Sequence, residues 1–172
     1  MFDSFSAPAL LFISFVIAQR LGELWLARRN TRRLLARGAH EVGASHYPLI
    51  VVLHTAWLVA MLVSGWRAEV SLGWLLVYAL LQGLRVWILA SLGARWTTRI
   101  IVLPEPPVRR GPYRFLSHPN YMLVVTEIFV VPMVLGLVGV ALVFTALNAA
   151  ILALRISVEN KALTSYRRVT SQ

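Results

Sequence analysis

Residues 110–121 combine the side chains that a polar, charged ligand requires. The stretch reads RGPYRFLSHPNY and holds two arginines, two tyrosines and a histidine beside proline and glycine. Tyr113 and Tyr121 offer aromatic faces to a purine or to a cation such as a sulfonium. His118-Pro119 is typical of a helix start, where free N–H groups bind anionic atoms. The stretch therefore fits a nucleotide-like ligand with a carboxylate and a positive sulfur. The alternative is an interfacial loop held by its aromatic residues.

A second polar group lies at Arg155 and Glu159, four residues apart and hence on one face of a helix. The arginine would orient an acceptor, and the carboxylate would meet a ligand hydroxyl, amine or sulfonium. The alternative is an ion pair at a helix end, which contributes only a few tenths of a kcal/mol. The chain contains no cysteine, and its histidines are scattered without an i,i+4 pair, so no metal site is expected.

These residues must be positioned by a membrane protein. The 172-residue chain is 58% hydrophobic and 14% charged, whereas soluble domains carry about 25% charged residues. The net charge of +10 comes from arginines that cluster between apolar runs. This placement indicates contact with membrane lipids and not with nucleic acid.

Five apolar runs predict an all-α, polytopic membrane fold with about five transmembrane helices and a cytoplasmic cofactor-binding region. A span needs about 20 mostly apolar residues. The fourth run is short, and Glu127 and Pro132 within it indicate that other helices shield it. The last two runs should form a tight hairpin. The whole chain, residues 1–172, is read as one membrane domain, with a cofactor loop at 96–121, a C-terminal site helix at 150–165, and spans at residues 7–27, 48–66, 70–94, 122–135 and 137–154.

The arginines predict the orientation. They crowd the first and third connections and the C-terminal tail, while the second connection has no net charge and the fourth has no charge at all. With five spans, all basic connections fall on one side, so this side is expected to face the cytoplasm and the N-terminus the outside.

Three further features allow two interpretations each. Residues 21–37 are either an amphipathic extension that collects a lipidic substrate or a basic helix end on anionic headgroups. His54, within a span, is expected to be a packing or hydrogen-bonding residue instead of a ligand. Arg85 is expected to pair with Glu127 or to reach the interface, and not to do chemistry.

Taken together, the two polar groups resemble the isoprenylcysteine carboxyl methyltransferase family of integral-membrane enzymes, which use S-adenosylmethionine. The family signature resembles G-x-Y-x-x-x-R-H-P-x-Y, two spans, then R-x-x-x-E-E. This chain has the glycine, tyrosine, His-Pro-x-Tyr, arginine and first glutamate at matching positions. Ser117 stands where arginine is usual, and Asn160 stands where the second glutamate is usual. The Asn160 departure argues against the family's prenylcysteine specificity.

The N-terminal half is similar to a bacterial subgroup that includes alkylpyrone and alkylresorcinol O-methyltransferases linked to type III polyketide synthases. The similarity lies in short strings at residues 19–24, 27–30, 41–48 and 93–101. It implies a lipophilic small-molecule acceptor from the bilayer, location in the bacterial inner membrane, an active site facing the cytoplasm, and a functional link to such a synthase.

The resemblance also implies roles for individual residues. The segment from Glu105 to Val108 should contact the cofactor mainly through its backbone, because its side chains are not the family's usual ones. Arg155 should face the acceptor oxygen, Glu159 should close the cofactor pocket, and Thr98 is a weaker candidate. His46 is a candidate for substrate contact. The full expected set for S-adenosylmethionine is Glu105, Pro106, Pro107, Val108, Tyr113, His118, Pro119, Asn120, Tyr121 and Glu159.

The predicted function is therefore an S-adenosylmethionine-dependent O-methyltransferase that acts on an alkylpyrone or alkylresorcinol. One alternative is a carboxyl methyltransferase of prenylated cysteine. An alternative from another class is a non-catalytic membrane scaffold or lipid-binding subunit, which would not bind S-adenosylmethionine.

Overall fold

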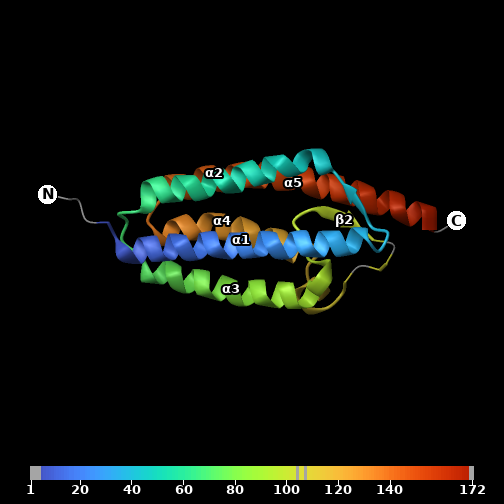
Figure 1. Ribbon diagram of the computed structural model, residues 1–172, viewed down its shortest axis with the longest axis horizontal. Helices are drawn as coiled ribbons and strands as arrows, with labels where there is room; N and C mark the ends of the chain where they lie inside the picture. The colour runs from blue at the N-terminus through green and yellow to red at the C-terminus, as the bar shows by residue number, and fades with distance from the viewer. Residues whose placement is uncertain (1–4, 104, 107, 171–172) are drawn as a thin grey trace.

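Five antiparallel helices form an elongated bundle in the computed structural model, which describes residues 5–103, 105–106 and 108–170, with side chains as far as Glu159 (Figure 1). Helix α4 packs against α3 and α5, while α2 packs against α1 and α5. Four helices are long and apolar enough to cross a membrane, and α4 is shorter. The helices are α1 Ala7–Leu35, α2 Tyr47–Gly65, α3 Leu72–Leu92, α4 Pro119–Val134 and α5 Val138–Thr170.

Local sequence sets where several helices begin and end. Ser6 caps α1 by accepting a hydrogen bond from the backbone N–H of Ala9. A proline lies in the first turn of α2 and of α4. Backbone N–H groups in a first turn have no partner within the helix, so proline's lack of an N–H costs no hydrogen bond there. Gly136, with φ of 66°, lies in the short turn before α5, so α4 and α5 form the predicted hairpin. Helix α1 continues without a break from the first apolar run through the arginine-rich segment.

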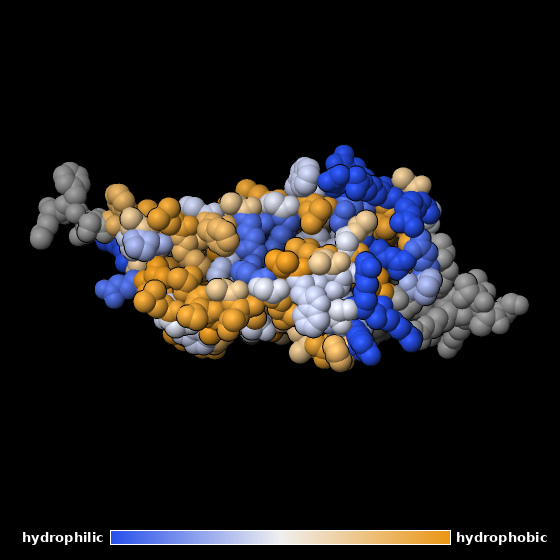
Figure 2. Space-filling model, turned by 90° about the horizontal axis from the view of Figure 1, so that it is seen from below, coloured by the Kyte–Doolittle hydropathy of each residue, from blue (hydrophilic) through white to orange (hydrophobic). Residues whose placement is uncertain are grey.

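Polar and apolar surfaces separate along the length of the bundle. Figure 2 shows hydrophobic residues over the part nearer the N-terminus and hydrophilic residues gathered at the opposite end. At this opposite end, which we call the basic end, α1 and α3 finish and α4 begins (Figure 1). The three short helical turns also lie there: η1 Ala44–His46, η2 Gly93–Arg95 and η3 Gly111–Arg114.

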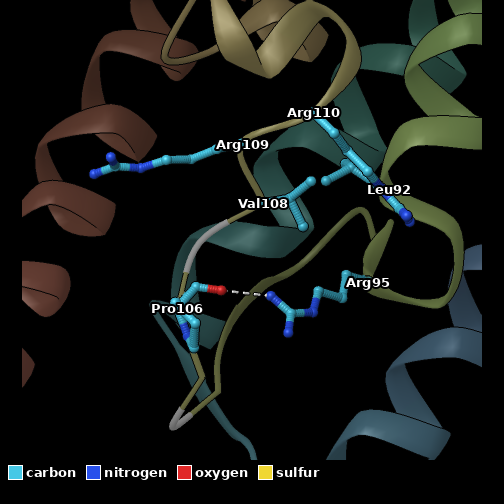
Figure 3. Close-up of a pocket in the computed structure, with 6 residues that line it drawn as sticks. All are labelled: Leu92, Arg95, Pro106, Val108, Arg109 and Arg110. Carbon is cyan, nitrogen blue, oxygen red and sulfur yellow. Dashed lines mark hydrogen bonds between the residues drawn. The ribbon is translucent and has the colours of Figure 1, made fainter.

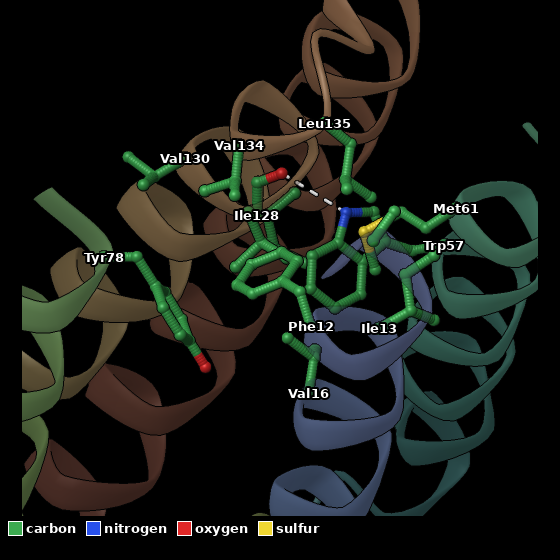
Figure 4. Packing of buried hydrophobic residues seen from close by; sticks show 12 residues of the cluster. Phe12, Ile13, Val16, Trp57, Met61, Tyr78, Ile128, Val130, Val134 and Leu135 are labelled. Carbon is green, nitrogen blue, oxygen red and sulfur yellow. Dashed lines mark hydrogen bonds between the residues drawn. The ribbon is translucent and has the colours of Figure 1, made fainter. Parts of the chain in front are cut away.

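The apolar core lies toward the N-terminal end of the bundle. Side chains from α1, α2, α3 and α4 meet there, and Trp57, Ile13 and Val131 are almost fully enclosed. The Trp57 indole N–H donates to the carbonyl oxygen of Ile128 at 3.2 Å, which ties α2 to α4 (Figure 4). This apolar core fixes α1, α2, α3 and α4 relative to one another, and the polar site residues lie at the other end of the bundle.

A polar network crosses the bundle partway along its apolar length, where Figure 2 also shows a hydrophilic patch. Glu127 of α4 is fully buried and accepts hydrogen bonds from Arg20, Gln82 and Arg85. Arg85 also pairs with Glu23 at 2.7 Å. The predicted Arg85–Glu127 pair is confirmed, and it belongs to a larger group that links α1, α3 and α4.

A two-stranded antiparallel sheet at the basic end was not predicted from the sequence. Strand β1 His40–Val42 pairs with β2 Ile100–Val102, with Glu41 opposite Ile101. Each strand lies in or beside one of the short strings noted above, residues 41–48 and 93–101. The Arg99 guanidinium donates two hydrogen bonds to the Glu41 carboxylate, at 2.8 and 2.7 Å. The sheet therefore holds together two connections that lie far apart in the sequence.

Candidate functional site

The start of α4 arranges the His-Pro-x-Tyr residues. Pro119 is the first residue of the helix and His118 precedes it, as predicted. The rings of His118 and Tyr121 stack at 5.4 Å between centroids. Asn120 accepts a hydrogen bond from the indole N–H of the buried Trp96 at 3.2 Å. The helix start thus presents an aromatic pair, while Asn120 fixes the turn that follows α3.

Glu159 joins the two polar groups that the sequence separates by a hairpin. The Tyr121 hydroxyl donates to the Glu159 carboxylate at 2.6 Å. Burial, together with the nearby Glu159 carboxylate, raises the pKa of Tyr113 above its usual value, so this phenol stays neutral. Tyr113, Tyr121 and Glu159 therefore come together from η3, α4 and α5. A carboxylate near two aromatic side chains is an arrangement that favours a cation.

Tyr113 is held in place by an unusual approach of η3 to α3. Gly111 has a φ of 57°, and a Cβ atom there would collide with the Ser91 side chain. Arg110 adds a hydrogen bond from its Nε to the Ser91 carbonyl oxygen at 2.8 Å. Glycine is therefore required at this position for two independent reasons, backbone conformation and space.

Arg155 is buried one helical turn before Glu159. Only 5% of its surface is exposed, and it donates to the carbonyl oxygen of Thr98 at 2.9 Å. The Thr98 hydroxyl lies 3.2 Å from that of Tyr47. Arg155 also lies close to Tyr121. The arginine does not form the simple i,i+4 ion pair with Glu159, since no Arg155–Glu159 bridge occurs among the described residues.

His46 lies beside the same part of α5. A Cβ atom on Gly43 would fall 3.5 Å from His46 Nδ1 and 2.9 Å from a Val158 methyl group, so these two side chains border one glycine. His46 Nδ1 is buried without a hydrogen-bond partner. The chain thus brings His46 near the helix turn that carries Arg155 and Glu159.

A cavity of about 480 Å³ opens between the end of α3 and the proline-rich segment (Figure 3). Three arginines line it, and this volume lies in the range of small-ligand sites. Arg95 donates to the Pro106 carbonyl oxygen at 2.7 Å and pairs with the Glu105 carboxylate. The lining consists of Leu92, Arg95, Pro106, Val108, Arg109 and Arg110.

The predicted site residues thus fall into two groups. Tyr113, His118, Tyr121, Arg155 and Glu159 gather around the start of α4 and the middle of α5. Pro106 and Val108 line the arginine cavity, whose lining includes neither Tyr121 nor Glu159. The Glu105 carboxylate is engaged by Arg37 at 2.5 Å as well as by Arg95. Pro107 lies outside the described residues, as does the side chain of Asn160.

Sequence reasoning missed Arg95 and Arg109 as ligand candidates, since it counted them only as charges that orient the protein in the membrane, whereas Arg110 belongs to the stretch 110–121 that was expected to bind a ligand. The position of Arg95 and Arg109 on both sides of a proline-rich segment could have indicated a shared site. Prolines hold the chain extended and so fix the positions of the residues that flank them. His54 bonds through Nδ1 to the carbonyl oxygen of Ile50 at 2.8 Å, as expected of a hydrogen-bonding residue.

The chain is similar to known proteins over most of its length. Residues 74–165 match the model of the isoprenylcysteine carboxyl methyltransferase family. The uncharacterized protein YpbQ of Bacillus subtilis is 37% identical over 162 residues, which cover 91% of this chain and 96% of that protein. An uncharacterized protein of Haemophilus influenzae is 26% identical over 168 residues, 90% of this chain and 96% of its own. No solved structure matches the chain significantly.

Proposed function

The chain belongs to the isoprenylcysteine carboxyl methyltransferase family, a family of membrane methyltransferases, and we propose that it methylates an oxygen of a lipophilic acceptor with S-adenosylmethionine. The observation that carries this proposal is the 2.6 Å hydrogen bond from the Tyr121 hydroxyl to the Glu159 carboxylate. Tyr113 lies near this carboxylate, and the buried Arg155 lies one helical turn before it. This meeting unites both halves of the family signature.

The side chains at the basic end fit the chemical groups of S-adenosylmethionine. When bound, it supplies a methyl group on a positively charged sulfur that leaves as a neutral thioether. Glu159 and the rings of Tyr113 and Tyr121 favour such a positive charge. Arg95 and Arg109 line the cavity at the end of α3 and suit a carboxylate.

Arg155 serves the acceptor in this proposal. A buried guanidinium lowers the free energy of a deprotonated oxygen nearby, so it favours ionisation of the acceptor. The protein needs no nucleophile of its own, and its task is alignment, which supplies several kcal/mol of the rate enhancement. An enolic pyrone or a carboxylic acid ionises readily, whereas a resorcinol would need help from Glu159 or His46.

The acceptor that we propose is an alkylpyrone or alkylresorcinol that enters from the bilayer, while S-adenosylmethionine enters from the cytoplasm at the basic end. The two segments that resemble the alkylpyrone and alkylresorcinol subgroup, residues 41–48 and 93–101, support this choice. They are brought together by the pairing of β1 with β2, and the Thr98 carbonyl oxygen of the second segment accepts a hydrogen bond from Arg155. Prenylated cysteine is the alternative acceptor within the family. A type III polyketide synthase is the proposed source of the substrate, and the bacterial inner membrane the proposed location.

The experiment is transfer of labelled methyl groups by purified protein in detergent. Arg155→Ala and Glu159→Ala are each expected to lower turnover of an accepted substrate by at least tenfold. Glu69→Ala, at the opposite end of the bundle, is the control and should leave turnover unchanged. Full activity of both site variants would show that the site is elsewhere.

A second measurement separates the enzyme from a non-catalytic scaffold. A scaffold would bind no S-adenosylmethionine, and replacement of His118 or Tyr121 would then change nothing in a cofactor titration. Saturable binding that is lost on replacement of Tyr121 supports the enzyme.

A further inference from the structure

Buried polar atoms without a partner are concentrated on one face of α5. Six such side-chain atoms occur among the described residues, and four of them belong to this helix. They are Thr145 Oγ1, Asn148 Oδ1, Asn148 Nδ2 and Arg155 Nε. The proposed chemistry uses Arg155 but gives no role to Thr145 or Asn148.

Among these residues, Asn148 has the largest unmet need for hydrogen bonds. Its surface is fully enclosed, and neither its carbonyl oxygen nor its NH2 group has a hydrogen-bond partner. A buried amide without partners is unfavourable, and buried polar groups in native proteins are almost always bonded. A leucine would fill the same place within an apolar span at no such cost. The amide therefore has a use that the protein alone does not reveal.

The position of Asn148 connects it to the proposed acceptor site. Asn148 and Arg155 are seven residues apart, which is close to two full turns, so they share one face of α5. Their Cα atoms are separated by about 10 Å along the axis. Helical side chains lean toward the N-terminus of their helix, so the Asn148 and Arg155 side chains lean in the same direction and keep a comparable spacing. Only Leu152 lies between them on this buried face.

We infer that the acceptor carries a second oxygen, which is not methylated and which bonds to the Asn148 amide while the reacting oxygen lies at Arg155. This inference rests on the proposed methyl transfer and specifies its substrate class. An amide both donates and accepts, so it suits a hydroxyl group, with the Thr145 hydroxyl as a second partner. A dihydroxylated ring with an alkyl tail fits the two sites, whereas an amphiphile with one polar group leaves Asn148 unpaired.

Two probes that differ by one hydroxyl group test this inference, 5-pentadecylresorcinol and 3-pentadecylphenol. Wild-type protein should prefer the resorcinol by about tenfold in kcat/KM, the factor that corresponds to 1.4 kcal/mol. The resorcinol should also raise the melting temperature in detergent more than the phenol does, which is a readout independent of turnover.

Asn148→Leu should remove both preferences while the Kd for S-adenosylmethionine stays within twofold of wild type. Its melting temperature without acceptor should be equal to or above that of wild type, because an unpaired amide has been removed. Thr145→Val should reduce the preference in the same direction. Thr126→Val is the matched control, since this exposed hydroxyl bonds only to the Met122 carbonyl oxygen of its own helix.

Two results would overturn the inference. One is a variant Asn148→Leu that melts several degrees lower yet keeps the preference for resorcinol, since Asn148 would then be a helix contact. The other is wild-type protein that binds S-adenosylmethionine but treats both probes alike. Failure to bind S-adenosylmethionine at all would instead refute the proposed function.

Discussion

Removal of the Glu127 carboxylate should destabilise the protein more than any single change at its surface. Four charged side chains meet in the polar network: Arg20, Arg85, Glu23 and Glu127 sum to zero charge. Glu127 is fully buried, and it accepts hydrogen bonds from both arginines and from Gln82. Glu127→Leu leaves a net charge of +1 inside the bundle.

The size of the effect follows from this imbalance. Breaking a buried ion pair by removal of one partner costs about 3–5 kcal/mol. For a chain of this length, 1 kcal/mol corresponds to a shift in melting temperature of about 2–4 °C. Glu127→Leu should therefore lower the melting temperature by about 6–20 °C. The double variant with Arg85→Leu restores neutrality, because Arg20 and Glu23 remain paired, and it should recover most of the loss.

Thermal unfolding in detergent at one scan rate is the assay, with Glu69→Leu as the exposed control. A Glu127→Leu variant that melts within 2 °C of wild type would contradict a stabilising role for this carboxylate. A double variant that loses as much stability as the two single variants added together would show that charge balance plays no part.

Two further changes test the site itself. Tyr121→Phe removes a hydrogen bond to the Glu159 carboxylate and should weaken S-adenosylmethionine binding by about tenfold or more, as measured by calorimetric titration. Gly111→Ala places a Cβ against Ser91 at positive φ and should destabilise the protein by at least ~1–2 kcal/mol. Gly139→Ala, in open space within α5, should instead stabilise it by up to ~1 kcal/mol, and equal melting curves for the two alanine variants would contradict this account.

The sequence predicted the helices well because lipid imposes a simple rule. Every spanning backbone must satisfy its own hydrogen bonds, so long apolar runs become helices. The hairpin around Gly136 and the helix start at Pro119 follow from residues with few conformational options. The pairing of Arg85 with Glu127 was predictable for a related reason, since a charge within a span requires a partner.

The basic end was less predictable because its contacts join residues far apart in the chain. No periodic pattern marks a three-residue strand, so the pairing of β1 with β2 left no signal in the sequence. The Tyr121–Glu159 contact was suggested only by family resemblance, because spacing alone favoured an Arg155–Glu159 ion pair. The burial of Asn148 depends on how α5 is rotated against its neighbours, which hydrophobicity does not specify where one polar residue interrupts an apolar run.

The central claim is that Tyr113, Tyr121 and Glu159 form one pocket for S-adenosylmethionine. Calorimetric titration of purified protein in detergent tests it most directly, with wild type, Glu159→Gln and the control Glu69→Gln. Loss of a charged hydrogen-bonding group should weaken binding to Glu159→Gln by about 10–100-fold, while Glu69→Gln binds as wild type does. Equal affinity in all three proteins, or no binding to wild type, would contradict the claim.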